Sequence, residues 1–165
     1  MAEQSADEAR ALIEALGLTP HPEGGWYREL HRSAVAVRRD GDGSRRCGLT
    51  LITYLLEAGA ISRWHRVRGA DEIWQHLGGA PLQLWRLPPG GGRSEALTLA
   101  PLQPQQPELT PCLVVAADWW QAARSLGAWS LVSCCVGPGF DFADFELLRE
   151  QTGGAALPGA DPALL

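Results

Sequence analysis

The stretch GAISRWHRVRGADEIWQHLGG, residues 59–79, is the part of the chain that decides the fold. On both sides of Gly69, residues alternate in the way that is typical of strands with two different faces. The alternation predicts one shared face for Arg63, His65 and Val67 and another for Glu72, Trp74 and His76. A turn at residues 68–70 would then bring His65 and Glu72 together inside a barrel.

The spacing of this stretch resembles the first motif of the cupin superfamily. The pattern GxxxxxHxVxxxxExxxxxxG places Gly59, His65, Glu72 and Gly79 at four of the five anchor positions. Val67 stands where the motif usually has a second histidine.

Length and composition limit the classes of protein to consider. The chain has 165 residues, of which 45% are hydrophobic, and this is enough for one good core. A net charge of −5 without a basic stripe argues against nucleic acid as the main partner. All 14 basic residues are arginines, so Schiff-base chemistry on lysine and a P-loop are excluded.

We expect no membrane partner and a cytoplasmic location. No apolar run approaches the roughly eighteen residues of a membrane span, and the acidic, polar first ten residues are not typical of a signal peptide. The four cysteines have no CxxC spacing, so we expect reduced thiols in or near the core. They are Cys47, Cys112, Cys134 and Cys135.

Three segments are predicted along the chain. Residues 1–17 form a helix that packs on the outside of a sheet, with a capping box at Ser5 and Glu8 and a stop at Gly17. Residues 18–150 form a single domain of short strands between Gly/Pro loops, as in a double-sheet jelly roll. Residues 151–165 lack periodicity and are expected to be loose.

Two charged or aromatic stretches inside this domain are given structural interpretations. Residues 38–46, RRDGDGSRR, are predicted to form a solvated hairpin tip. In PGFDFADF, residues 138–145, the alternation of phenylalanine with aspartate predicts that the rings point inward and that Asp141 and Asp144 point outward.

The stretch LTPHPEGGWYRE, residues 18–29, has two interpretations. Its prolines forbid a helix, and Gly24 and Gly25 permit tight backbone. As a strand lead-in, it would cover a barrel edge or cross to a partner subunit, and turn chemistry alone explains its composition. As a functional segment, it would place His21, Glu23 or Arg28 at the mouth of a pocket.

Three blocks together resemble cupin family 5 within the cupin superfamily. They are LGLTPHPEGGWYREL, SRWHRVRGADEIW and SLVSCCVGPGFDFADFELL, and they extend from Leu16 to Leu148. The resemblance implies an RmlC-like β-barrel with a central pocket, often a homodimer. It does not imply a particular reaction.

The second cupin motif is altered at its metal-binding position. In the best match, residues 116–125, Gln121 occupies the place of the usual histidine. Valine cannot bind a metal ion, and a glutamine oxygen is a poor ligand for transition metals. We therefore expect no cofactor, and a divalent metal at His65, Glu72 and Gln121 is the alternative.

Two functions are consistent with these residues. The first is a metal-free isomerase or epimerase acting on a sugar-like or carbonyl compound, with His65 and Glu72 as catalytic residues. The second is a ligand-binding cupin that uses the same pocket without catalysis, and a metal-dependent enzyme is a third option. The predicted ligand-binding residues are Gln121, Trp74, His76, Arg63 and Arg28. The expected partners are a small-molecule ligand and a second copy of the chain.

Overall fold

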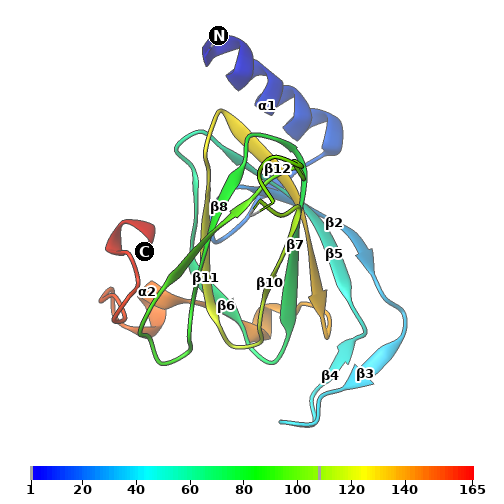
Figure 1. Cartoon of the computed structure of the whole chain (residues 1–165). Coiled ribbons are helices and arrows are strands. Elements are labelled where there is room, and N and C mark those ends of the chain that lie inside the picture. The colour runs from blue at the N-terminus through cyan, green and yellow to red at the C-terminus, as the bar shows by residue number, and fades with distance from the viewer. Residues whose placement is uncertain (1, 108) are drawn as a thin grey trace.

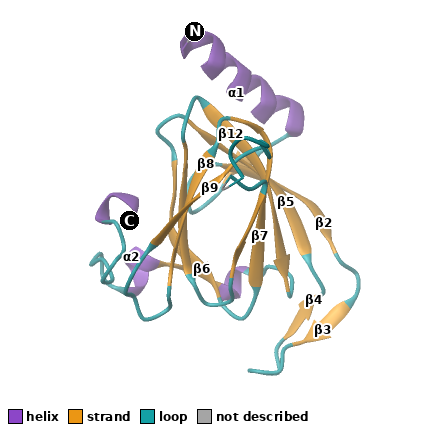
Figure 2. Ribbon diagram, in the orientation of Figure 1, coloured by secondary structure: helices purple, strands orange, loops and turns teal. Residues whose placement is uncertain are grey.

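The computed structural model describes residues 2–107 and 109–165, and in it two antiparallel sheets face each other (Figures 1 and 2). The larger sheet has six strands in the order β1-β2-β5-β12-β7-β10, and the smaller has five in the order β13-β6-β11-β8-β9. A separate two-stranded hairpin, β3-β4, extends from one side. The predicted double-sheet jelly roll is confirmed.

The elements follow one another in chain order with short connections. The first half contains α1 (Ala2–Leu16), β1 (Thr19–Pro20), β2 (Trp26–Arg32), β3 (Ala36–Arg38), β4 (Arg45–Cys47), β5 (Thr50–Glu57), β6 (Ile61–Val67) and β7 (Asp71–Gly79). The second half contains β8 (Leu82–Leu87), β9 (Glu95–Leu99), β10 (Cys112–Val115), β11 (Trp120–Ser125), β12 (Trp129–Gly137), the 3₁₀ turn η1 (Phe142–Asp144), β13 (Phe145–Leu147), α2 (Leu148–Gln151) and η2 (Pro162–Leu164).

The N-terminal helix packs on the barrel, as the sequence predicts. It contacts β5 and β12, and its Ala9 is fully buried. The helix ends before Gly17, where the amide of Leu18 donates to the carbonyl of Ile13 at 2.9 Å. The predicted capping box depends on the side chain of Ser5, which lies outside the described residues.

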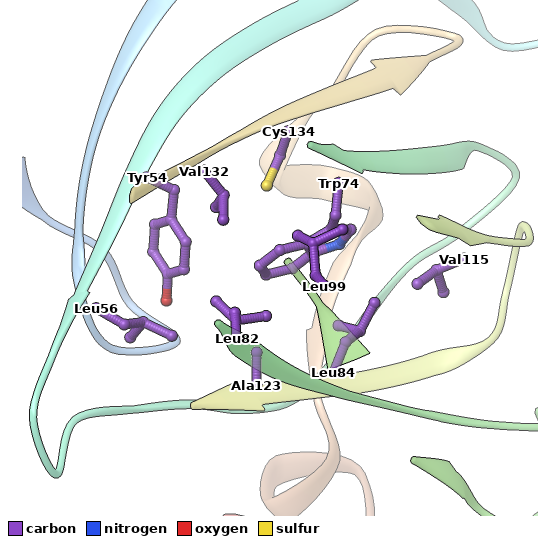
Figure 3. Packing of buried hydrophobic residues seen from close by; sticks show 10 residues of the cluster. All are labelled: Tyr54, Leu56, Trp74, Leu82, Leu84, Leu99, Val115, Ala123, Val132 and Cys134. Carbon is purple, nitrogen blue, oxygen red and sulfur yellow. The ribbon is translucent and has the colours of Figure 1, made fainter. Parts of the chain in front are cut away.

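The core fills one part of the space between the two sheets (Figure 3). Side chains from both sheets meet there, with the rings of Tyr54 and Trp74 packed edge to face at 5.9 Å. The buried members of this cluster are Tyr54, Leu56, Trp74, Leu82, Leu84, Leu99, Val115, Ala123, Val132 and Cys134. All four cysteines are free thiols, and no described helix is long and apolar enough to cross a membrane.

An irregularity in β6 changes which of its side chains point inward. Gln121 of β11 pairs with His65 of β6, and Ala123 pairs with Ser62. Between these two pairs β11 advances by two residues and β6 by three, so β6 contains one extra residue. The extra residue is a β-bulge, which shifts the alternation of the bulged strand. Ser62 and His65 therefore both face the interior, and the prediction that Arg63 shares the inward face with His65 is wrong.

The C-terminal segment is packed, which corrects the expectation of a loose tail. Ala160 and Leu164 are buried against Trp64 and Leu148 on the outer face of the smaller sheet. The indole nitrogen of Trp64 donates to the carbonyl of Asp161 at 3.0 Å. Short buried contacts of this kind leave no periodic pattern in a sequence.

The tip of the hairpin between β3 and β4, residues 40–43, is exposed as predicted, but two of the flanking arginines are not solvated. Arg39 and Arg46 reach Asp144, with closest nitrogen-to-oxygen distances of 3.1 and 2.7 Å. The side chains of all three residues are mostly buried. Phe142–Asp144 forms a 3₁₀ turn instead of a strand, so the predicted outward position of Asp144 is wrong.

Replacing Leu164 should test the packed C-terminal segment. Leu164→Ala removes a buried side chain and leaves a cavity, so we expect the free energy of unfolding to fall by about 2–5 kcal/mol. Leu126→Ala, at an exposed position, should change it by less than about 0.5 kcal/mol. Urea unfolding of both variants measures the difference, and equal small effects would contradict the packing.

The homodimer is still a prediction. Leu30 on β2 and Val114 on β10 are exposed apolar residues of the larger sheet, and β10 is one of its edges. Exposed edges of this kind need cover, and a twofold dimer is the commonest way to provide it. Light scattering at micromolar concentration should give about twice the chain mass of 17.8 kDa. A monomer would contradict the prediction.

Candidate functional site

A cavity of about 250 Å³ lies between the sheets, beside the apolar core. The cavity and the core occupy successive parts of the same strands. On β7, Trp74 belongs to the core and Glu72 lines the cavity; on β12, Val132 belongs to the core and Val136 lines the cavity. The lining residues are Gly17, Thr19, His21, Glu23, Tyr27, Arg28, Glu29, Arg32, Ile52, His65, Val67, Glu72, Cys134, Val136, Phe140, Phe142 and Phe145.

The loop between β1 and β2 inserts its tip into this space. Thr19 and Pro20 pair with Tyr27 and Trp26, so residues 18–29 form a hairpin within their own chain. A Cβ on Gly24 would lie 2.1 Å from the carbonyl oxygen of Ile61, which no other residue type tolerates at this backbone position. Both sequence interpretations hold in part: β1 forms an edge of the larger sheet, and His21, Glu23 and Arg28 line the cavity. A crossing to a partner subunit stays a prediction.

Glu23, at the tip of this loop, is the centre of the polar part of the site. Its side chain is buried, and one carboxyl oxygen accepts from the hydroxyl of Ser62 at 2.9 Å. The other oxygen lies 3.1 Å from Nε2 of His65 and 3.3 Å from Nδ1 of His21. Two imidazole rings therefore contact one carboxyl group.

The tautomer of His65 follows from its second contact. Its Nδ1 lies 2.7 Å from the carbonyl oxygen of Arg63, which can only accept, so Nδ1 carries a proton. In the neutral ring Nε2 is then a bare acceptor directed at Glu23. The 3.1 Å contact needs a proton, either on the Glu23 carboxyl or on Nε2.

His21 presents a second bare nitrogen to the same carboxyl. Its Nδ1 accepts from the backbone amide of Glu23 at 3.3 Å, which leaves the proton of the neutral ring on Nε2. The ring packs against Tyr27 and Phe145, with centroids 4.6 and 5.7 Å apart. Contacts on both sides fix the orientation of the imidazole.

Glu72 is held by a chain of hydrogen bonds from the core. Its carboxyl accepts from Nε2 of Gln121 at 2.5 Å, and Oε1 of Gln121 accepts from the indole of Trp74 at 2.8 Å. Because an indole N–H can only donate, it fixes the orientation of the Gln121 amide. Gln121 and Trp74 therefore position Glu72.

Burial shifts the pKa values of the two buried glutamates and the two histidines beside them toward the neutral forms. The pKa values of Glu23 and Glu72 are raised above 4.5 mainly by desolvation, and the neighbouring histidines partly oppose the rise. The pKa values of His21 and His65 are lowered below 6.5, again mainly by desolvation. These directions favour a protonated Glu23 that donates to a neutral His65.

The structure brings together some of the predicted site residues and separates others. His65, Glu72 and Arg28 line the cavity. Within the described chain, Gln121 and Trp74 lie behind the cavity wall, and Arg63 and His76 also lie outside the lining. The cavity therefore does not support direct ligand contact by these four, which stays a prediction. Arg63 donates to the carbonyl of Glu23 at 3.3 Å, and Nε2 of His76 lies 3.0 Å from the carbonyl of Ala80.

The residues at the cupin metal positions do not fit a metal ion. The side-chain oxygen of Gln121 is taken by Trp74, and Val67 has no donor atom. Among the described residues there is no group of three or more His, Cys, Asp or Glu side chains that could hold a metal ion. Assigning Gln121 as a metal ligand is therefore not supported.

His21 and Glu23 are candidate functional residues that the sequence alone leaves undecided. The pair of glycines after Glu23 was the available signal, because such a pair permits a backbone to approach another strand closely. The loop inserts next to β6, which lies about 40 residues further along the chain. No local pattern encodes this contact.

The pH dependence of stability should report the neutral state of Glu23. The pKa of Glu23 is raised in the folded protein. The stabilising contribution of Glu23 is therefore complete below pH 4.5 and is lost as the pH rises through the raised pKa. Glu23→Gln removes this loss, so the stability of the variant relative to the wild type should increase as the pH rises above 4.5. Guanidinium unfolding at a series of pH values measures the difference, and a relative loss of stability would contradict a neutral Glu23.

Comparison with known proteins identifies the family of this architecture. A family model described as Cupin_5, Cupin superfamily (DUF985), matches residues 10–148. No curated protein matches the sequence.

Several solved structures share the fold. A protein from Shewanella oneidensis is 32% identical, with a TM-score of 0.80 over 95% of this chain and 96% of that chain. A hypothetical protein from Leishmania major is 30% identical, with a TM-score of 0.76 over 88% and 92% of the two chains. A structure described as a dTDP sugar isomerase from Desulfovibrio desulfuricans is 14% identical, with a TM-score of 0.53 over 87% and 98%, and supports the fold alone.

Proposed function

This chain belongs to the Cupin_5 (DUF985) family of the cupin superfamily, and we propose that it is a metal-free isomerase or epimerase that moves a proton on a small carbonyl or sugar-like compound. The observation that carries the proposal is the 3.1 Å contact between Glu23 and His65 inside a cavity of about 250 Å³. A buried acid in contact with a buried base is the arrangement that proton transfer requires.

His65 is the proposed general base. The carbonyl of Arg63 holds Nδ1 at 2.7 Å, so Nε2 is the ring nitrogen that can accept a proton, once a substrate has displaced its 3.1 Å contact with Glu23. Its lowered pKa keeps the ring unprotonated at neutral pH, which a base requires before it reacts. The nearby carboxyl of Glu72 stabilises the imidazolium once it has formed.

Glu23 is the proposed general acid. Its contact at 3.1 Å with Nε2 of His65 needs a proton, and its raised pKa favours that proton on the carboxyl. The proton can pass to the carbonyl oxygen of a substrate as His65 removes a hydrogen from the adjacent carbon. This step breaks the C–H bond and forms an N–H bond on His65, while the O–H bond of Glu23 breaks and that of the enol forms. In an α-hydroxy carbonyl compound, return of the proton from His65 to the former carbonyl carbon and loss of the neighbouring hydroxyl proton to Glu23 complete the isomerisation, with no oxidant or reductant.

Ligand binding without catalysis is the second candidate function. The cavity has an apolar side formed by Ile52, Val67 and Val136, which would bury the hydrocarbon part of a ligand without any chemical step. In this case Glu23 and His65 would only recognise polar groups of the ligand.

Exchange of hydrogen for deuterium separates the two functions. The protein is incubated in D₂O with a panel of keto sugars and small cyclic ketones, and loss of the carbon-bound proton signal is followed by NMR. We expect exchange to slow by about 10²–10⁴-fold in His65→Asn and in Glu23→Gln. His31→Asn, at an exposed position on β2, is the matched control and should exchange at the wild-type rate.

The outcome is decided by binding and exchange together. Compounds that bind but do not exchange would support the ligand-binding function and reject the enzyme. Exchange at the wild-type rate in both site variants would contradict the assignment of acid and base. A melting temperature close to the wild-type value should accompany the loss in His65→Asn.

A further inference from the structure

Three phenylalanines form one side of the cavity mouth. Phe140, Phe142 and Phe145 all line the cavity, and their ring centroids lie 5.0 to 6.1 Å apart in edge-to-face pairs. The ring of His21 lies nearly parallel to that of Phe142, with centroids 6.2 Å apart. The aromatic wall therefore adjoins the acid and base groups.

Phe142 is unusual in this wall because it is exposed. It has 55% of its surface accessible, although its two neighbours in the wall are half-buried. A lone exposed apolar residue needs no explanation. An exposed ring that adjoins two others and lines a cavity leaves an aromatic surface for a ligand to cover.

The turn that carries Phe142 is held in place from outside. Asp144, two residues later, is buried and accepts from Nε and Nη2 of Arg46 at 2.7 and 2.9 Å. Arg39 contacts the same carboxyl at 3.1 Å. The carboxyl of Asp141 accepts from the amide of Ala143 at 2.9 Å. A turn fixed in this way loses little freedom when a ligand packs against it.

Size and chemistry together define the ligand class. A cavity of about 250 Å³ lies just below the range of about 300–1,000 Å³ that is usual for drug-sized ligands, so one ring with its substituents fits. Polar groups adjoin the aromatic wall at Glu23 and His65.

We propose that the ligand is a single-ring compound whose flat apolar face lies on Phe142 and Phe145 and whose carbonyl or hydroxyl edge reaches Glu23 and His65. The inference rests on the proposed function for the identity of the polar edge. Phe142 is then a specificity-determining residue, which selects ring compounds over open-chain compounds of the same chemistry.

The probes for this proposal are cyclohexanone and hexan-3-one, a cyclic and an open-chain ketone with the same number of carbon atoms. Dissociation constants are measured by ligand-observed NMR on the full-length protein. Cyclohexanone should bind about fivefold to tenfold more tightly, since its ring has fewer rotatable bonds to immobilise against the aromatic wall than the open chain has. Equal binding of the two probes, or no binding of cyclohexanone, would overturn the proposal.

Three variants locate the effect. Phe142→Ala and Phe142→Leu should both weaken cyclohexanone binding by about fivefold, because both remove the flat phenyl surface that the ligand contacts, although leucine keeps apolar area. Leu77→Ala is the matched control, since Leu77 is also 55% exposed and lies outside the cavity lining, and it should bind cyclohexanone as the wild type does. Full ring preference in Phe142→Leu would overturn the proposal.

Failure of this inference differs from failure of the proposed function. A preference for cyclohexanone that depends on Phe142, without deuterium exchange into any compound, would support the ring site and reject the enzyme. Exchange that depends on His65 but proceeds equally on cyclic and open-chain ketones, with Phe142→Ala unaffected, would support the enzyme and reject the ring site.

Discussion

The insertion of the loop at residues 21–25 between the two sheets is the constraint on which the site depends. The loop is held from both sides, because the hydroxyl of Tyr54 on β5 donates to the carbonyl of Gly24 at 2.7 Å and the amide of Arg63 on β6 donates to the carbonyl of Glu23 at 2.8 Å. These backbone contacts place the Glu23 carboxyl against His65 and away from water. The shifted pKa values follow from that burial.

The sequence predicted the parts of this arrangement that depend on local pattern. Strand alternation and motif spacing placed His65 and Glu72 in the interior, and both are buried. Arg63 was misplaced because one extra residue in β6 forms a bulge, and alternation alone does not reveal where a bulge occurs. Glu23 was left undecided because its burial depends on a contact with a distant strand.

The glutamine in the second motif shows how a changed residue can keep a structural role. At position 121 a histidine would offer one nitrogen to the interior, whereas Gln121 both accepts from Trp74 and donates to Glu72. The amide therefore connects the apolar core to a carboxyl in the cavity. Seen from the sequence, the substitution indicated only the loss of a ligand, because the partner indole lies on another strand.

The contact between Asp144 and the β3-β4 hairpin gives the cavity mouth a connection to the outer surface. Arg39 and Arg46 belong to a hairpin that extends from the barrel, yet they hold the turn next to the candidate ring site (Figure 1). Binding free energies at two coupled positions are reciprocal. A molecule that binds this hairpin and displaces its arginines from Asp144 would therefore change the affinity of the cavity for its ligand. Bound ligand would in turn change the affinity of the hairpin for that molecule.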